Sequence, residues 1–107
     1  MTLITRTDNL LQLEAHRSRL ILDKKAGKAV FHRKILFMAL KPAEVDLADL
    51  VDVTVDVGVD RASGVEVCNM LLISRGGGAW AFPADDKVVA ERDAVAVRQF
   101  IGLPANA

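Results

Sequence analysis

Ten consecutive residues alternate valine with a polar residue or glycine: Val51-Asp52-Val53-Thr54-Val55-Asp56-Val57-Gly58-Val59-Asp60. Successive side chains of a β-strand point to opposite faces, so this alternation predicts a strand with one apolar and one polar face. The five valines are expected to face a core, and Asp52, Thr54 and Asp56 are expected to face water. The stretch indicates a β-rich architecture and carries no chemistry of its own.

Further strands are predicted on both sides of this stretch. After a polar break at 60–64, residues 65–74 include apolar side chains at both odd and even positions. This pattern is typical of a central strand covered on both faces. Towards the N-terminus, 20–23 and 28–33 flank a turn whose glycine, Gly27, suits a hairpin. Shorter strands are expected at 10–15, where helical spacing is the alternative, at 35–39 and at 79–82. Residues 1–9 are expected to form an extra strand or to be disordered.

One helix, 85–102, is predicted to close the chain. Asp85 is a candidate N-cap, Gly102 stands where a left-handed residue ends a helix, and Pro104 prevents its continuation. The residues at helical spacing on one apolar face are Ala90, Ala94, Val97, Phe100 and Ile101; Lys87, Glu91 and Arg98 lie opposite, and Val88, Val95 and Ala96 lie off the stripe. Because strands and helix are segregated along the chain, the helix is expected to dock on an antiparallel sheet.

The order of these segments resembles the pleckstrin-homology-like (PH-like) fold, and more closely a group of small bacterial domains with that fold. The resemblance spans about residues 18–104 and rests on three segments: Leu20-Ile21-Leu22-Asp23 with its glycine turn, Val45-Asp46-Leu47-Ala48-Asp49-Leu50, and Phe100-Ile101-Gly102-Leu103-Pro104. It implies a mainly β fold, a bent antiparallel β-barrel or sandwich of about seven strands capped by the C-terminal helix. It also implies a non-catalytic binding or adaptor module, since members of that fold serve mostly as scaffolds that bind lipids, peptides or one another.

A basic segment lies in and after the first hairpin loop. Phosphoinositide-binding members of the PH-like fold carry basic residues there, and the corresponding positions are Lys24, Lys25, Lys28, Arg33 and Lys34. The Arg-x-Arg pair that such members carry on the second strand is missing, because Arg33 is followed by Lys34 and Ile35. These five residues are the candidate site for an anionic lipid headgroup or nucleic acid, and a solvated hairpin tip is the alternative.

Other polar residues do not form a recognisable catalytic or metal-binding motif. The aspartates at 46, 49, 52, 56 and 60 are spread along an extended segment, where residues four apart lie about 13 Å from each other. Cys68 falls in a strand expected to be buried, where a thiol behaves as a small hydrophobe. His16 and His32 do not stand in a metal-ligand spacing. The run Arg75-Gly76-Gly77-Gly78 lacks the Gly-Lys-Ser/Thr ending of a phosphate loop and is typical of a hairpin turn.

Composition bounds the class of protein. A chain of 107 residues suits one domain, 1–107, that needs no metal or disulfide to fold. With one Trp, four Phe and no Tyr, an aromatic platform for nucleic acid is not favoured. A single cysteine fits a reducing compartment, so a cytoplasmic location is expected, and no apolar run approaches the roughly 20 residues that span a bilayer.

Charge is distributed unevenly along the chain. Residues 1–41 carry nine Lys or Arg and three acids, whereas 42–107 carry five and eleven. This asymmetry either gives the molecule opposite faces that favour partners or self-association, or is offset between neighbouring strands. The expected function is therefore protein–protein interaction, including self-association, with anionic ligand binding as the alternative. No enzyme activity, metal or cofactor is predicted.

Overall fold

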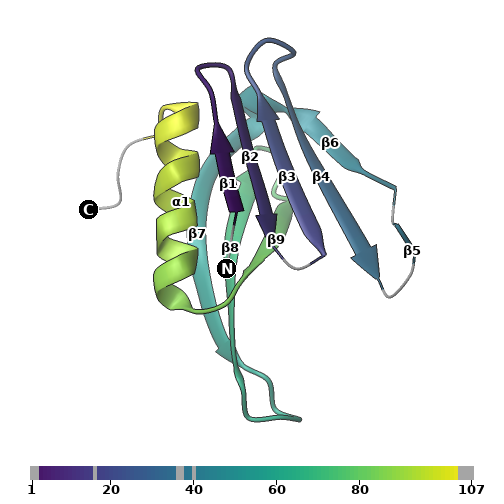
Figure 1. Cartoon of the computed structure of the whole chain (residues 1–107), viewed down its shortest axis with the longest axis vertical. Helices are drawn as coiled ribbons and strands as arrows, with labels where there is room; N and C mark the ends of the chain where they lie inside the picture. Colours follow the sequence, from purple (N-terminus) through teal and green to yellow (C-terminus); the bar gives the residue numbers. More distant parts are fainter. Residues whose placement is uncertain (1–2, 16, 36–37, 40, 104–107) are drawn as a thin grey trace.

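A computed structural model of the chain describes residues 3–15, 17–35, 38–39 and 41–103. These residues form nine strands, one 3₁₀ turn and one α-helix, two strands more than the seven or so expected. The mainly β arrangement with the helix last is as predicted. The strands divide between two antiparallel sheets. Figure 1 shows the strands of the first sheet in purple and blue in front of those of the second, with the helix alongside both.

The first sheet contains six strands: β1 (Leu3–Arg6), β2 (Leu10–Ala15), β3 (Ser18–Asp23), β4 (Lys28–Ile35), β5 (Met38–Ala39) and β6 (Ala43–Asp46). β1 to β4 form a meander, and β4 then pairs with β5 at its end and with β6 along its first half. Residues 3–6 form the extra strand that was one alternative for the N-terminus, and 10–15 is a strand rather than a helical turn.

The second sheet contains β7 (Leu50–Val59), β8 (Glu66–Ser74) and β9 (Ala79–Ala84), in that order. The 3₁₀ turn η1 (Leu47–Asp49) connects β6 to β7. β9 extends past Phe82 through Pro83, which an edge strand tolerates because proline lacks only an amide donor. Among the described residues the two sheets remain separate, so these residues form a two-sheet sandwich and do not close into a barrel.

The helix α1 (Lys87–Ile101) packs against β7, β8 and β9. Its N-cap is Asp86, whose carboxylate accepts the amide of Val89 at 2.9 Å, so the predicted cap at Asp85 is one residue early. Gly102 ends the helix in the left-handed conformation (φ 81°), as predicted. Pro104 lies outside the described residues.

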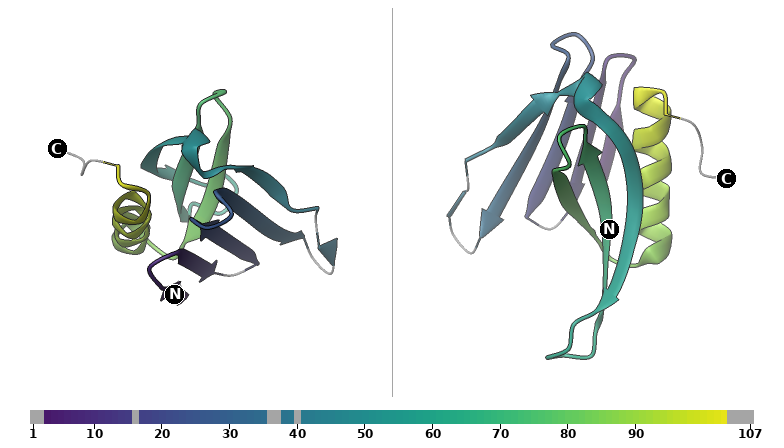
Figure 2. Two further views of the ribbon diagram at one scale, coloured as in Figure 1. Left: turned by 90° about the horizontal axis from the view of Figure 1, so that it is seen from above. Right: turned by 180° about the vertical axis from the view of Figure 1, so that it is seen from behind.

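The core lies between the two sheets and the helix (Figure 2). Its buried side chains come from all three layers: Leu11, Leu13, Leu20, Leu22, Ala29 and Phe31 from the first sheet, Val53, Met70, Leu72 and Phe82 from the second, and Ala94, Val97 and Phe100 from α1. The predicted apolar face of the helix is therefore the face that docks. No helix among the described residues is both long and apolar enough to cross a membrane.

The prediction that all five alternating valines face the core is wrong at both ends of β7. The register with β8 shifts between Leu50 and Asp52, which leaves Val51 in a bulge and exposed. Val53 is fully buried and Val55 partly so, but the hairpin then runs beyond the core and Val57 and Val59 are exposed. Figure 1 shows this β7–β8 hairpin projecting at the bottom of the molecule.

β8 is the central strand of its sheet, as expected, but it is covered on one face only. Cys68, Met70 and Leu72 are buried, whereas Leu71 and Ile73 on the opposite face are partly exposed and Val67 is exposed. Apolar residues at both odd and even positions of β8 therefore do not mean that both of its faces are covered.

Candidate functional site

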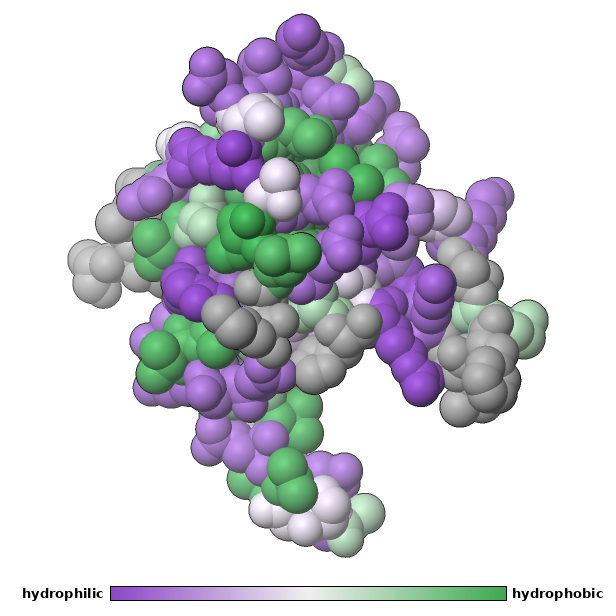
Figure 3. All heavy atoms as spheres, in the orientation of Figure 1, coloured by the Kyte–Doolittle hydropathy of each residue, from purple (hydrophilic) through white to green (hydrophobic). Residues whose placement is uncertain are grey.

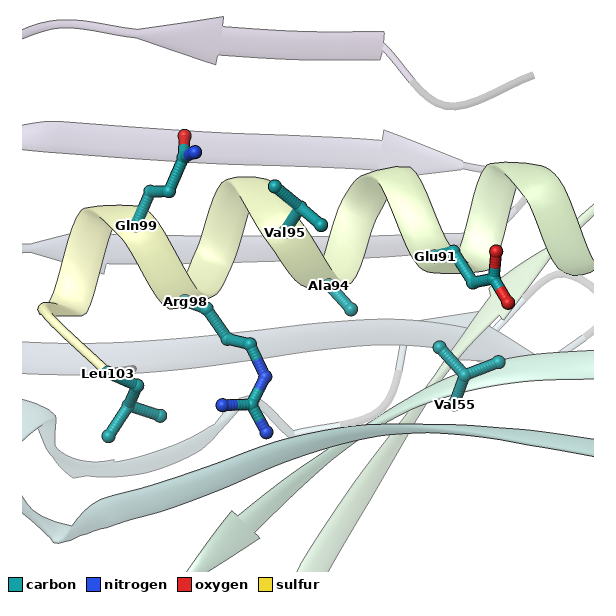
Figure 4. Close-up of a pocket in the computed structure, with 7 residues that line it drawn as sticks. All are labelled: Val55, Glu91, Ala94, Val95, Arg98, Gln99 and Leu103. Carbon is teal, nitrogen blue, oxygen red and sulfur yellow. The ribbon is translucent and has the colours of Figure 1, made fainter. Parts of the chain in front are cut away.

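A groove with a volume of about 350 Å³ runs between α1 and β7. Its lining residues are Val55 from β7, Glu91, Ala94, Val95, Arg98 and Gln99 from α1, and Leu103 beyond the helix end. Figure 4 shows Arg98 reaching from α1 towards β7, and Val55 pointing from β7 towards α1. The groove combines apolar walls with a few polar groups, the usual composition of a binding surface.

Arg98 ties the helix to the edge of β7. Its Nε donates to the carbonyl oxygen of Val53 at 2.9 Å, and its guanidinium also pairs with the carboxylate of Asp52. That carboxylate in turn accepts the amide of Val53 at 2.8 Å. The expectation that Arg98 and Asp52 face water is therefore wrong: Arg98 is buried and Asp52 is half-buried in an ion pair.

One edge of β7 does not pair with β8, and it continues from Val53, the residue that Arg98 contacts, towards Val59. The contact of Arg98 with the Val53 carbonyl shows that Val53 directs its backbone away from β8, whereas the Asp60 amide donates to Val65 across the hairpin at 2.9 Å. Backbone groups of an antiparallel strand alternate in direction, so Val55, Val57 and Val59 also direct their amides and carbonyls away from β8. Val57 and Val59 are not among the residues that line the groove, and both side chains are exposed.

The residues of this edge whose backbone points outward, Val55, Val57 and Val59, have apolar side chains. Val57 is 41% exposed and Val59 is 66% exposed, and Val95 on the neighbouring helix is 53% exposed. In Figure 3 apolar side chains, in green, are visible on the hairpin that projects at the bottom. We use the name valine edge for residues 55–59 of β7. Outward-directed backbone groups and exposed apolar side chains thus coincide on one short segment.

Two other hollows are less suited to recognition. The larger, about 600 Å³, is lined by apolar and glycine residues and contains no polar side chain that could orient a ligand: Gly27, Leu47, Ala48, Leu50, Val51, Ile101 and Leu103. The smaller, about 280 Å³, contains Ser74, whose hydroxyl already donates to the carbonyl of Gly78 at 3.0 Å.

The structure does not gather the five predicted basic residues into one site. Lys24 places its Nζ 4.4 Å from the centre of the Phe100 ring, and Lys25 is exposed in the same turn. Lys28 pairs with Asp46 across β4 and β6; the hydrogen bond to Asp46 and its charge raise the pKa of Lys28. Arg33 and Lys34 lie towards the opposite end of β4, about 17 Å or more from Lys28 at the usual rise of a strand.

The aspartates also fail to converge. Asp46 pairs with Lys28, Asp52 pairs with Arg98, and Asp60 accepts the amide of Ala62 in the hairpin turn. Within the described ranges no three His, Cys, Asp or Glu side chains are grouped so as to hold a metal ion. Gly77, in the turn between β8 and β9, has φ 90°, as befits the predicted hairpin tip.

Cys68 is 3% exposed and faces the core from β8, as predicted. Burial raises the pKa of its thiol, and Glu66, which accepts a hydrogen bond from Sγ at 3.4 Å, raises it further. His32 lies on β4, in the other sheet, and is only partly exposed; His16 is outside the described residues. Cys68 therefore occupies a structural position in this fold.

We expect Cys68 to react slowly in the folded protein. A raised pKa leaves less thiolate at mildly alkaline pH, and burial blocks access, so at about pH 8 a disulfide reagent such as DTNB should modify it at least about tenfold more slowly than in the urea-unfolded chain. The rate is measured by absorbance after mixing. Equal rates in the folded and unfolded states would show that the thiol is accessible.

Arg98 and Asp93 are the polar residues of α1 that the sequence reasoning missed. Asp93 is fully buried, and the guanidinium of Arg92 lies 3.9 Å from its carboxylate. The helical spacing along the sequence already places both residues on the buried face of α1. Asp93 follows Ala90 by three positions and Arg98 follows Ala94 by four, so both belong to the apolar stripe by position although not by residue type.

The geometry defines a two-sheet β-sandwich with a C-terminal helix and a groove along an open strand edge. Comparison with protein-family models, with curated proteins and with solved structures produced no match.

Proposed function

We propose that this chain is a non-catalytic protein-binding module on a PH-like scaffold, and that it binds an extended polypeptide segment along the valine edge. The observation that carries the proposal is the coincidence, at residues 55–59, of outward backbone groups and exposed valines beside the groove under α1. The single buried cysteine is consistent with a cytoplasmic location for such a module.

Addition of a strand to an exposed sheet edge is a common mode of peptide recognition. Backbone hydrogen bonds supply affinity, and pockets for alternate side chains supply specificity. Here the outward amides and carbonyls of Val55, Val57 and Val59 would supply the hydrogen bonds. The groove beside Val55 and Val95 would receive alternate apolar side chains of the added segment.

Recognition of an anionic ligand by the basic hairpin is less well supported. The charges of Lys28 and Asp46 offset each other, Lys24 lies over an aromatic ring, and Arg33 and Lys34 lie at the far end of β4. A phosphate site needs several cations around one anion, and these cations do not surround a common point.

Lysine substitution on the valine edge tests the proposal. Peptides selected from a random peptide display library on the immobilised chain are expected to lose at least about tenfold in affinity with the Val57→Lys variant, since an edge lysine obstructs strand addition. Binding is measured by calorimetry or fluorescence anisotropy.

Val67→Lys is the matched control. Val67 is 44% exposed on the same hairpin, close to the 41% of Val57, but its cross-strand partner is Gly58, so it lies on the opposite face. Its binding is expected to match that of the unaltered chain. Selected peptides that bind both variants equally, or the absence of any selected peptide, would refute the proposed site.

A further inference from the structure

We propose that the segment that adds to the valine edge is β7 of a second copy of this chain, paired antiparallel about a twofold axis at Val57. This inference rests on the function proposed above and names the partner. Its support is the sequence of the edge itself, which is self-complementary in one register.

With the axis at Val57, every close pair across the seam is compatible. Val57 lies opposite Val57 of the second copy, and Val55 lies opposite Val59. On the other face of the ribbon, Asp56 lies opposite Gly58 and Thr54 opposite Asp60. Valines therefore meet valines, and no carboxylate meets another directly, an arrangement that avoids the destabilisation caused by opposed like charges.

The backbone agrees with this register. The residues whose amides and carbonyls point away from β8 are Val55, Val57 and Val59, and in this register each of them lies opposite another outward residue. Such antiparallel pairs exchange two hydrogen bonds each, which gives about six across the seam. The ladder ends at Val53, whose carbonyl already accepts from Arg98.

The neighbouring registers are less favourable. An axis at Asp56 places the Asp56 carboxylates of the two copies opposite each other, and an axis at Gly58 places Asp56 opposite Asp60. An axis at Val55 places Val57 opposite Val53, whose carbonyl Arg98 occupies. An axis at Val59 places Val57 opposite Arg61.

The second strand would run beside the groove between α1 and β7. Val59 of the second copy would lie beside Val55 and point to the same face of the joined sheet, the face on which α1 packs. It would therefore contact the groove wall near Val95, a side chain that is 53% exposed in the single chain. Dimerisation would reduce the exposure of Val57, Val59 and Val95.

Disulfide cross-linking of single-cysteine variants tests this register directly. In a Cys68→Ala background, the variants Asp56→Cys, Val57→Cys and Gly58→Cys are each treated with a mild oxidant, and the covalent dimer is followed by non-reducing electrophoresis. Opposed residues of an antiparallel pair are about 5.5 Å apart at Cα, within disulfide range, whereas a two-residue offset exceeds the limit of about 7 Å.

We expect Val57→Cys to form dimers at least about tenfold faster than the two flanking variants. Sedimentation of the unaltered chain should show a concentration-dependent dimer that Val57→Lys abolishes and Val67→Lys retains. Equal or faster cross-linking of a flanking variant would overturn the register. A chain that stays monomeric at every concentration and does not cross-link would overturn the self-pairing.

The peptide-binding measurement separates the two proposals. If the chain is monomeric but selected peptides bind and are lost with Val57→Lys, the edge binds other polypeptides and only the self-pairing fails. If neither peptides nor a second copy bind at the valine edge, the proposed function fails with it.

Discussion

Replacement of Phe100 by alanine is expected to lower the free energy of unfolding by about 3–5 kcal/mol, the usual cost of removing a buried phenylalanine ring. Phe100 is 1% exposed and belongs to the central core cluster. Two cations also lie over its ring: Arg6 of β1 at 5.7 Å from its centre, and Lys24 of the turn between β3 and β4 at 4.4 Å. The ring thus holds the C-terminal end of α1 against the first sheet.

Denaturation by urea, followed by circular dichroism and by the fluorescence of Trp80, the single tryptophan, measures this change. Phe100→Leu retains most of the apolar volume but removes the ring face, so a smaller loss, about 1–2 kcal/mol, is expected. Val95→Ala, at an exposed position of the same helix, is the control and should change stability by less than about 0.5 kcal/mol. Equal effects of Phe100→Ala and Val95→Ala would contradict the docking of α1.

Replacement of Arg98 by alanine is expected to cost about 2–4 kcal/mol, because it removes the guanidinium that a buried carbonyl and a half-buried carboxylate accept from. The affected groups are the Val53 carbonyl and the Asp52 carboxylate. The side chain also fills space between α1 and β7, which truncation would empty. Urea denaturation of the variant measures the loss.

Two further variants identify the cause. Arg98→Lys keeps the charge but replaces the planar guanidinium, which contacts both oxygen acceptors, by a single ammonium group, so it should recover less than half of the loss. Gln99→Ala, at the adjacent exposed position, should change stability by less than about 0.5 kcal/mol. Full recovery with lysine would show that charge alone matters at this position.

The elements that could be predicted from sequence are those whose signals are local. The helix end at Gly102 depends on one residue that adopts a left-handed conformation without strain, and the stripe from Ala90 to Phe100 depends on spacing alone. The hairpin strands on either side of Gly27 were likewise identified correctly, since alternation and turn chemistry agree there.

What could not be predicted depends on tertiary context. The bulge at Val51 has no sequence signature within an unbroken alternation, yet it decides that Val51 is exposed while Leu50 and Val53 are buried. Alternation also cannot show where the core ends, so the exposure of Val57 and Val59 was missed. The same limit applies to β8, whose apolar outer face remains partly exposed.

The candidate site was only partly foreseen. Val95 was identified as an apolar residue off the main stripe, and it lines the groove. Arg98 was assigned to the water-facing side because charged residues usually lie there, although its position belongs to the stripe. The resemblance to phosphoinositide-binding PH-like members groups the five basic residues, but a strand as long as β4 places Lys28 and Arg33 far apart.

The hairpin between Val57 and Val65 contributes no side chain to the core cluster, which has a consequence for variation of chain length. Insertions or deletions at its tip, around Ala62 and Ser63, can lengthen or shorten the arm while the sandwich stays intact. Because the faces of Val57 and Val59 are set by their pairing with β8, residues added or removed at the tip leave both valines on their face. An odd number of residues inserted into each strand between Val55 and Val57 would instead move both valines to the opposite face of the arm.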